Sequence, residues 1–273
     1  MTRQVLKRSC FVPMLILSVS GATAACEFAV QGEGHVAQII DARTIRLDDG
    51  RDVRLAGLEM MDEDAGRGRD ALARSVMGRE VTLHGTDDRP DRYGQQIAFV
   101  AVKGASAPVQ LELVAQGIAA ASPAVTDRAC LSALLAAEGT VRAAKRGIWG
   151  SSIALKNAER PDDILARTGR FSVVEGTVLS ARPAGAVFYL NFGRRWTRDF
   201  AVTISKRMMP SFAAAGIDLN SLTGKKIRVR GWIERRGGPR IEARLPGQIE
   251  MVAAADPALR DSAAGMLARD EGK

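Results

Sequence analysis

The sequence contains few of the residues that metal and redox sites use. Only 3 Cys and 2 His occur among 273 residues, and zinc sites draw mostly on clusters of these two types. The sequence therefore does not support a zinc enzyme. After the first 24 residues no apolar run approaches the roughly 20 residues that span a bilayer. The rest of the composition, 46% hydrophobic and 26% charged, is that of a globular protein long enough for two domains.

The N-terminal segment has the three parts of a secretory signal. Arg3, Lys7 and Arg8 precede the apolar run 11–19, and the small residues at 22–24 follow it. This order predicts a cleaved signal peptide over residues 1–24 and export to the periplasm or beyond the cell. The apolar run is too short to cross a membrane, and an uncleaved amphipathic start is the alternative.

Cleavage after residue 24 removes Cys10 and leaves two cysteines, Cys26 and Cys130. Disulfides persist in the compartments to which such signals lead. A bridge between Cys26 and Cys130 closes a loop of about 100 residues, worth up to ~4.7 kcal/mol in the chain-entropy description. Two buried free thiols are the alternative.

Charge divides the chain into two unlike halves. Residues 25–150 carry 15 basic and 18 acidic side chains, a net −3, whereas residues 170–252 carry 15 basic and 6 acidic, a net +9. We therefore predict one domain over 25–150 and a basic domain over 170–252. The polar residues 151–169 between them, which include Pro161, predict a linker or a short capping helix. Residues 253–273 form a tail rich in Ala and Asp.

Short strands predominate in the first domain. The alternation of apolar residues predicts strands at 35–40, 44–47, 51–58, 80–84 and 96–102, with helices at 68–77, 108–116 and 126–147, the last capped by Thr126. Five strands with an embedded helix and closing helices are typical of the oligonucleotide/oligosaccharide-binding (OB) barrel.

The second domain repeats this order of elements. Strands are predicted at 171–179, 186–192, 199–204, 226–233 and 240–245, with a short helix at 210–215 and a turn at Gly237-Gly238-Pro239. The fold class predicted for the whole chain is mainly β with helices, arranged as two tandem OB-like five-stranded barrels.

Four short motifs follow one another in the first domain. They are Asp41-Ala42-Arg43-Thr44, Val53-Arg54-Leu55-Ala56-Gly57-Leu58-Glu59-Met60-Met61-Asp62, Asp91-Arg92-Tyr93-Gly94-Gln95 and Arg146-Gly147-Ile148-Trp149. In this order, over residues 34–150, they resemble the thermonuclease family of staphylococcal-nuclease-like phosphodiesterases. The family's first three motifs are Asp-Gly-Asp-Thr, Val-Arg-Leu-x-Gly-Ile-Asp-x-Pro-Glu and Asp-Arg-Tyr-Gly-Arg. No single motif is specific, so the order carries the resemblance.

The resemblance implies a calcium-dependent nuclease site that this chain alters. In the family two aspartates and a main-chain carbonyl hold calcium, a Glu orients the attacking water, and two arginines bind the transition state. By position, Arg54 keeps one clamping Arg and Asp62 shortens the Glu. Glu59 lengthens one metal ligand, Arg43 replaces the other, and Gln95 replaces the second Arg.

These changes are unfavourable for catalysis. Calcium needs 6 to 8 oxygen ligands, whereas Arg43 introduces a cation; two unit charges 4 Å apart interact by about 4 kcal/mol at an effective dielectric constant of 20. Loss of a transition-state donor costs roughly 3 to 4 kcal/mol more. We expect a weak or inactive nuclease with no calcium, in which Arg43 pairs with Glu59 or Asp62. The alternatives are an Arg43 that extends into solvent, and a metal still held by Glu59, Asp62, Asp41 and waters.

Tyr93 corresponds to a family residue near the sugar and phosphate of the bound nucleotide. A tyrosine that simply packs at a hairpin end is the alternative for this position. His35 and His84 have no partner that the sequence identifies, and we assign them no chemistry.

The second domain offers arginines and aromatic rings for binding. Strand alternation places several of them on the outer face, beside a basic loop. The predicted set is Tyr189, Trp196, Arg228, Arg230, Trp232 and Arg244. Rings stack on unpaired bases and arginines bind phosphates, so this face suits single-stranded nucleic acid. Other polyanions or acidic lipids are alternatives, as is a solvated face with Trp232 packed on the first domain.

The sequence thus favours an exported protein that binds nucleic acid or another polyanion and retains little or no phosphodiesterase activity. An active secreted endonuclease with atypical ligands is the first alternative. An envelope module that binds protein partners is the second.

Overall fold

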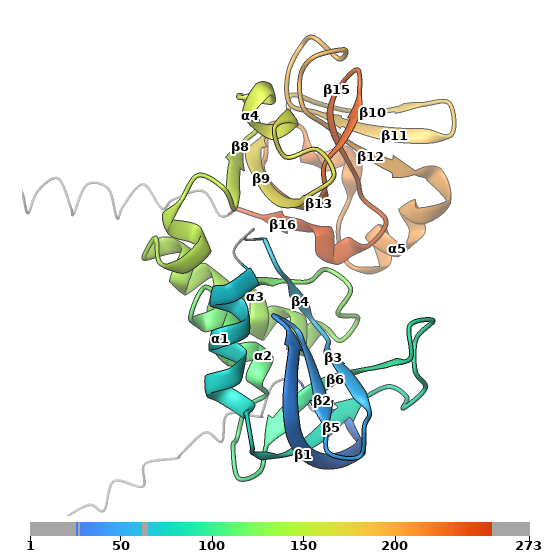
Figure 1. Cartoon of the computed structure of the whole chain (residues 1–273). Helices are drawn as coiled ribbons and strands as arrows, with labels where there is room; N and C mark the ends of the chain where they lie inside the picture. Colours follow the sequence, from blue (N-terminus) through green and yellow to red (C-terminus); the bar gives the residue numbers. More distant parts are fainter. Residues whose placement is uncertain (1–25, 27, 62–64, 253–273) are drawn as a thin grey trace, which may run out of the picture.

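The computed structural model describes residues 26, 28–61 and 65–252, which form two halves stacked on one another (Figure 1). The first half extends to about Gly150, and the second half follows it. The predicted signal peptide and the C-terminal tail lie outside the described residues. None of the described helices is long and apolar enough to cross a membrane.

The first half is built on a closed barrel of five strands in the order β1-β2-β3-β6-β5. These strands are β1 (Ala29–Asp41), β2 (Thr44–Leu47), β3 (Asp52–Leu55), β5 (Glu80–Gly85) and β6 (Gln95–Val102). The long β1 pairs antiparallel with β5 through its first part and with β2 through its second, and β3 pairs parallel with β6. Ile45 and Leu47 point inward while Arg46 is exposed, as strand alternation requires. The barrel predicted for this half is confirmed.

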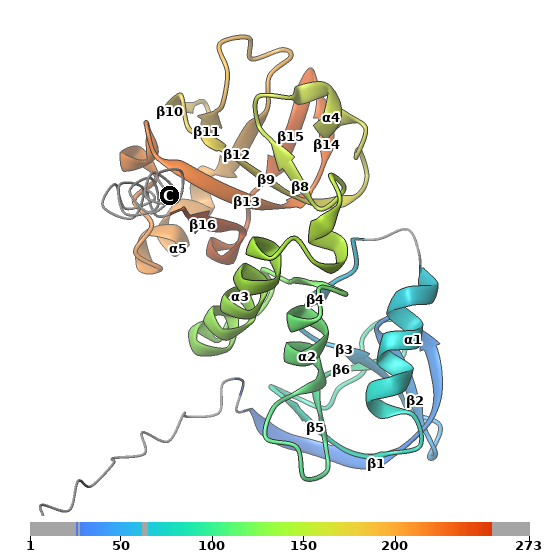
Figure 2. The same ribbon diagram turned by 90° about the vertical axis from the view of Figure 1, so that its left-hand side faces the viewer.

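Three helices cover one side of this barrel (Figure 2): α1 (Ala65–Val76), α2 (Val109–Ala115) and α3 (Arg128–Ala143). The cap of α3 is Asp127, whose carboxylate accepts a hydrogen bond from Cys130 N at 2.7 Å. The prediction of Thr126 as the cap is wrong by one residue, because Asp127 reaches the free N–H group three residues ahead. A short pair, β4 (Leu58–Glu59) with β7 (Ala120–Ala121), lies beside the barrel.

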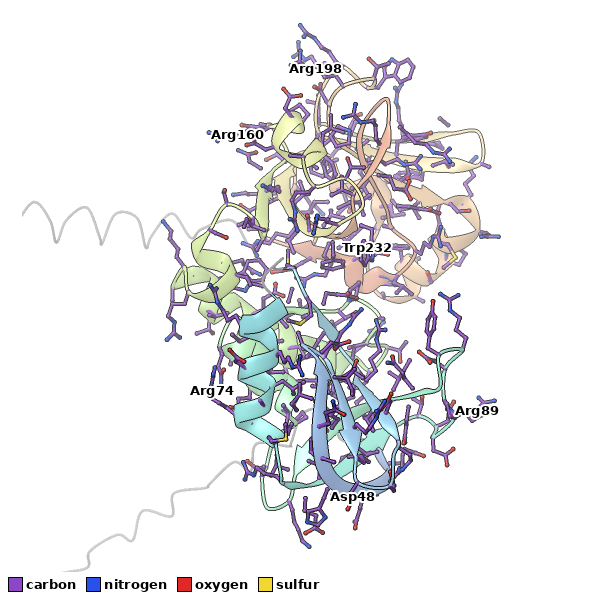
Figure 3. The ribbon with its side chains drawn as sticks, viewed as in Figure 1. Asp48, Arg74, Arg89, Arg160, Arg198 and Trp232 are labelled. Carbon is purple, nitrogen blue, oxygen red and sulfur yellow. A yellow bond between two sulfur atoms is a disulfide. The ribbon has the colours of Figure 1, made fainter. Side chains whose placement is uncertain are left out.

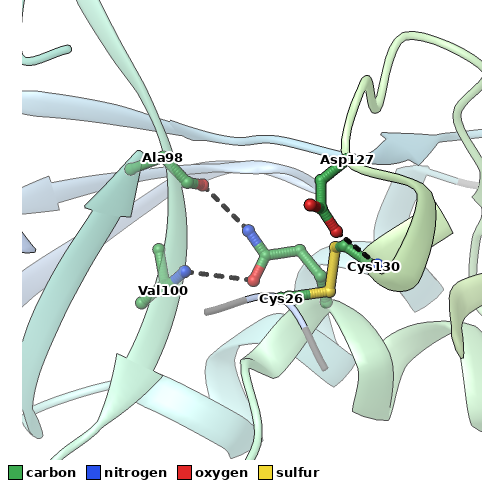
Figure 4. The surroundings of a disulfide bond; sticks show 6 residues. Cys26, Ala98, Val100, Asp127 and Cys130 are labelled. Carbon is green, nitrogen blue, oxygen red and sulfur yellow. Dashed lines mark hydrogen bonds between the residues drawn. A yellow bond between two sulfur atoms is a disulfide. The ribbon is translucent and has the colours of Figure 1, made fainter. Parts of the chain in front are cut away.

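A disulfide between Cys26 and Cys130 fastens the start of the described chain to α3 (Figure 4). The predicted bridge is therefore confirmed, and the alternative of two free thiols is wrong. Close by, the buried Gln110 of α2 donates a hydrogen bond to Ala98 O at 2.9 Å and accepts one from Val100 N at 3.1 Å. Side-chain and covalent bonds therefore hold both helices against the barrel.

The second half contains two sheets. The five-stranded sheet has the order β10 (Ser180–Ala184), β11 (Val187–Asn191), β12 (Ala201–Ser205), β15 (Gly238–Glu242), β14 (Glu234–Arg236). The four-stranded sheet has the order β16 (Ile249–Met251), β13 (Lys226–Trp232), β9 (Phe171–Thr177), β8 (Leu155–Asn157). Helices α4 (Pro161–Leu165) and α5 (Met209–Ala214) accompany them, with short 3₁₀ turns at Lys206–Met208, Leu219–Leu222 and Pro246–Gln248, while a further 3₁₀ turn, Gly147–Gly150, closes the first half.

A single closed barrel, as predicted for the second half, is not what these pairings form. The predicted strand 171–179 ends at Thr177, and β10 then joins a different sheet. The predicted strand 226–233 is found as β13, which ends at Trp232, and the next strand, β14, joins the five-stranded sheet instead. Both halves nevertheless contain a parallel pair between strands that are not consecutive in the chain: β3 with β6, and β12 with β15.

The segment 151–169 belongs to the second half. Its β8 pairs parallel with β9, and Ile164 of α4 is fully buried in the core of this half. The short helix expected there is present as α4. The interpretation of this segment as a linker is wrong, because the segment contributes a strand and a core residue to the second half.

A buried ion pair joins the two halves. Arg230 on β13 forms two hydrogen bonds of 3.0 Å with Glu138 on α3, and neither side chain is exposed. Arg230 also donates to Ala121 O of the first half at 3.0 Å and to Glu250 at 3.1 Å. Burial by itself lowers the pKa of Arg230, but the charges and hydrogen bonds of Glu138 and Glu250 outweigh it and raise the pKa. Arg142 completes the cluster by pairing with Glu138 at 2.6 Å and Glu250 at 3.2 Å.

Reduction of the disulfide should lower the free energy of unfolding by about 2 to 5 kcal/mol, because the unfolded chain gains the freedom that a closed loop denies it. Urea unfolding with and without reductant measures this. The variant Cys26→Ser, Cys130→Ser is the control, and its stability should not respond to reductant. An equal response in both proteins would contradict the assignment.

Substitution of Arg230 by Met should lower the free energy of unfolding by about 3 to 5 kcal/mol, because the fully buried Glu138 then loses its bidentate partner and keeps only Arg142. The double change Arg230→Met, Glu138→Leu should cost less than the sum of the two single changes. Arg244→Met, at a 71% exposed side chain paired with Glu242 on the surface, is the control and should change little. Additivity of the double change would show that the pair does not couple the halves.

Candidate functional site

The residues of the first two motifs meet where β1 ends, β2 begins, β3 ends and β4 lies, near the junction of the halves. Asp41 is the last residue of β1, Arg54 lies on β3 and Glu59 on β4. Met61, two residues after Glu59, accepts a hydrogen bond from Arg167 of the second half at 3.1 Å. The second half therefore borders the candidate site.

Arg43 pairs with Glu59. Its Nη1 lies 3.7 Å from Glu59 Oε2, and the other carboxylate oxygen, Oε1, accepts a hydrogen bond from Ser122 Oγ at 2.9 Å. The Arg43 side chain is 28% exposed, so the alternative of an Arg43 extended freely into solvent is wrong. Of the two partners that the sequence left open, the structure brings Glu59 to Arg43, whereas Asp62 lies outside the described residues.

Burial and charge oppose each other at this pair. Burial raises the pKa of Glu59, while the Ser122 hydrogen bond and the charges of Arg43 and Arg54 act in the other direction without cancelling it. For Arg43, burial lowers the pKa and the neighbouring Arg54 lowers it further. A guanidinium nevertheless stays protonated in proteins. Two cations, Arg43 and Arg54, thus lie near one partly buried carboxylate, that of Glu59. This excess of positive charge favours the binding of an anion.

Asp41 is engaged by its own turn. Its Oδ1 accepts the main-chain N–H of Arg43 at 2.8 Å, and its Oδ2 accepts the hydroxyl of Thr44 at 3.1 Å. These are the bonds of an Asx turn, which holds the chain between β1 and β2. Within the described part of the chain, no three or more His, Cys, Asp or Glu side chains gather where they could hold one metal ion.

Arg54 is the second cation of the candidate site. It sits between Thr44 of β2 and Ile97 of β6 in the barrel wall. No carboxylate of the described residues lies within ion-pair distance of it, although its charge reaches Glu59 and helps lower the pKa of Asp91 after the main-chain hydrogen bonds to that residue. Among the described residues, Arg54 thus has no ion pair to break before it binds an anion.

The loop of the third motif presents Tyr93 to solvent. Asp91 shapes it by accepting the main-chain N–H groups of Tyr93 at 2.8 Å and Gln95 at 3.1 Å. The Tyr93 side chain is 68% exposed, so the alternative of a packed hydroxyl is wrong. Arg92 lies over the Tyr93 ring, 4.7 Å from its centroid, and donates to its hydroxyl at 2.7 Å. Gln95 opens β6, opposite Asp52.

The structure divides the set predicted on the second half. Arg230 is the clear correction: it shares a strand face with Arg228, but α3 of the first half covers that face. Arg228 is 18% exposed and pairs with Glu175 and Glu250 at 2.6 and 2.7 Å. These two arginines stabilise the junction and are not a free binding surface.

The remaining predicted residues lie in three places. Trp232 is 57% exposed, at the edge of the second half that faces the first (Figure 3), and its ring meets Phe171 edge-on at 6.3 Å. Phe171 packs in a cluster with Met61, so Trp232 stands near the candidate site. Arg244 is exposed and paired with Glu242. Tyr189 and Trp196 line one cleft on the five-stranded sheet, together with Arg236 and Arg240.

Sequence reasoning missed Ser122 and Glu138. Ser122 follows β7 and carries no motif, so nothing in the sequence marks it. Glu138 was detectable, because it lies between Leu134 and Val141 on the buried face of α3. A lone carboxylate on an apolar helix face indicates a buried cationic partner.

Comparison with known proteins identifies a family for part of the first half of the molecule. Residues 60–151 match the family model described as staphylococcal nuclease homologue. The matched span contains the positions of Asp62, Tyr93 and Gln95, while Arg43 and Glu59 precede it. A search of curated proteins found no match. The chain therefore contains a domain of the staphylococcal nuclease type, which supports a nuclease-like or nucleic-acid-binding function.

The variant Arg43→Gln should raise the pKa of Glu59 further, because burial of the carboxyl group remains while one cation that stabilises its ionised form is removed. Arg54→Gln should raise it less. Carboxyl NMR titration measures these shifts. Arg46→Gln is the control, since Arg46 pairs with Asp52 on the exposed side of the barrel and should leave Glu59 unchanged. An unchanged or lower pKa in Arg43→Gln would contradict the pairing.

Proposed function

We propose that this protein is exported and binds nucleic acid or another phosphate polyanion, with weak or no phosphodiesterase activity. The observation that carries the proposal is the Arg43–Glu59 ion pair. A guanidinium stands against the one carboxylate that, by its place in the motif, would serve as a metal ligand.

The residues at this site do not fit calcium. The ion needs 6 to 8 oxygen ligands, and its affinity follows the number of carboxylates. Glu59 already faces Arg43 and accepts from Ser122, and both oxygens of Asp41 accept hydrogen bonds from the turn. A divalent ion next to Arg43 would also meet repulsion between like charges. We therefore assign the site no metal, and hydrolysis would lack its electrophile.

The same arrangement suits a bound phosphate. Arg54 is free of any ion pair within the described residues, and guanidinium groups bind phosphate oxygens through two parallel N–H donors. Arg43 would add a second cation when a phosphate competes for it with Glu59. Tyr93 and Arg92 lie on the loop beside the site, where a sugar or base attached to that phosphate could contact them.

The second half extends this affinity. Its net charge of +9 attracts polyanions in general. Trp232 supports a shared surface, because its exposed ring meets Phe171, a member of the same buried cluster as Met61 of the first half, and could stack on a base next to the bound phosphate. Export is supported by the disulfide, since such bonds persist in oxidising compartments.

Cleavage of single-stranded DNA by the mature protein in calcium tests the catalytic part. We expect little or no cleavage, and no tight calcium binding by calorimetry. The double change Arg43→Asp, Gln95→Arg restores one carboxylate and one clamping arginine, and it should gain cleavage that depends on calcium. Substantial wild-type turnover abolished by Arg54→Ala, together with tight calcium binding, would make the protein an active endonuclease.

Titration of a fluorescent single strand at several salt concentrations tests the binding part. Affinity should fall steeply with salt, because phosphate contacts release counterions. Arg54→Ala should weaken binding, whereas Arg46→Ala, elsewhere on the barrel, should change it less. An absence of strand binding at low salt would favour a protein-interaction module.

A further inference from the structure

A cleft of about 210 Å³ opens on the second half, away from the candidate site of the first. It lies on the five-stranded sheet, on the face opposite the core. Its polar and aromatic lining residues are Tyr189, Asn191, Trp196, Asp199, Arg236 and Arg240, and the small Ala201 lies among them. They come from three strands, one loop and one hairpin, so only the folded sheet assembles them.

Strand register explains the hollow. Asn191 of β11, Ala201 of β12 and Arg240 of β15 are direct neighbours across the sheet. The small Ala201 stands between two longer side chains and leaves a depression between them. Phe188, Leu190 and Val202 alternate to the other face and fill the core. One face of the sheet is therefore polar, with the small Ala201 between Asn191 and Arg240, and the opposite face is packed into the core.

The loop between β11 and β12 supplies an exposed ring. Trp196 is 74% exposed and makes no ring or cation contact within the described residues. Asp199 shapes the loop by accepting the N–H of Arg195 at 2.7 Å. Gly193 permits this shape, because a Cβ atom there would lie 2.1 Å from Asp199 Oδ2. The chain therefore holds a large apolar ring in water at the mouth of a cleft, which is a recurrent property of binding sites.

The cationic side of the cleft is not fully neutralised. Arg236 on the β14–β15 hairpin has no ion-pair partner within the described residues. Arg240 pairs with Glu234 at 2.5 Å, but its buried Nε has no hydrogen-bond partner in the described part of the chain. An N–H donor left unpaired in a protein interior costs free energy that a ligand acceptor can recover.

We propose that this cleft binds one unpaired base of a single-stranded nucleic acid. The base stacks on Trp196 beside Tyr189, Arg236 contacts an adjacent phosphate, and Asn191 and Arg240 face the edge of the base. The volume supports a single ring system, because it lies below the roughly 300 to 1,000 Å³ of sites for larger ligands. Duplex is excluded, because its bases keep their faces stacked on one another. The proposal deepens the proposed function and depends on it.

Tryptophan emission provides a direct test in the full mature chain. The three Trp residues are Trp149, Trp196 and Trp232, and Trp149 is buried. In the variant Trp232→Phe, quenching by an unlabelled single strand therefore reports on Trp196. We expect quenching by the single strand and none by a matched duplex. Ala201→Leu in the same background fills the floor of the cleft and should abolish quenching, with the fold checked by thermal unfolding.

Affinity variants provide the second test. Trp196→Ala should weaken single-strand binding about 5- to 100-fold, the loss of one stacked base. Arg236→Ala should weaken binding and reduce the salt slope by about one phosphate contact. Arg235→Ala is the matched control, since it removes the same charge one residue away on the same hairpin, outside the cleft. Equal effects of Arg235→Ala and Arg236→Ala would mean diffuse attraction and would overturn the proposal.

The outcomes separate this proposal from the function on which it rests. If the chain binds no single strand at low salt, the proposed function fails and the cleft proposal fails with it. If it binds, but neither Trp196→Ala nor Ala201→Leu changes affinity or emission, only the cleft proposal fails. Quenching by a duplex equal to that by the single strand would also overturn it.

Discussion

The buried contact between Arg230 and Glu138 is the constraint on which the arrangement of the molecule depends. Removing both charges from water is costly, and only a complete set of partners offsets that cost. The set here comes from four elements of the two halves: β7, α3, β13 and β16. Because a bidentate pair tolerates little movement, the second half is held at one orientation to the barrel. That orientation brings Arg167 of the second half into contact with Met61 in the second motif of the first half.

The same chemistry, a guanidinium against a carboxylate, occurs twice with different consequences. At the junction both side chains are fully buried, and two hydrogen bonds of 3.0 Å fix the geometry. At the candidate site the Arg43–Glu59 contact is 3.7 Å, both groups are partly exposed, and burial still raises the pKa of Glu59. The first pair fixes the two halves to one another. The second is a weaker contact from which a phosphate could draw Arg43 away, because a phosphate offers Arg43 a more strongly charged partner than Glu59.

The excess positive charge of the second half therefore has two roles. Arg228 and Arg230 satisfy carboxylates at the junction, so their charge is not available to a ligand. Arg236 remains on the surface at the cleft, and Arg194 and Arg195 are exposed on the loop that carries Trp196. Net charge alone does not separate these roles, because it does not say which cations have a partner. The ion pairs and hydrogen bonds at each guanidinium separate the two roles.

The sequence alone determined the features that depend on local pattern. Strand alternation located the first barrel, the motif order located Arg43, Arg54 and Glu59, and the two remaining cysteines indicated their own bridge. Alternation also placed Arg230 correctly on the outer face of β13, but a strand pattern carries no information on what covers that face. The tertiary structure decided that α3 covers it, that Glu59 meets Arg43, and that Tyr189, Trp196 and Arg236 share a cleft. These are contacts between residues far apart in the chain, fixed by packing and charge pairing rather than by local periodicity.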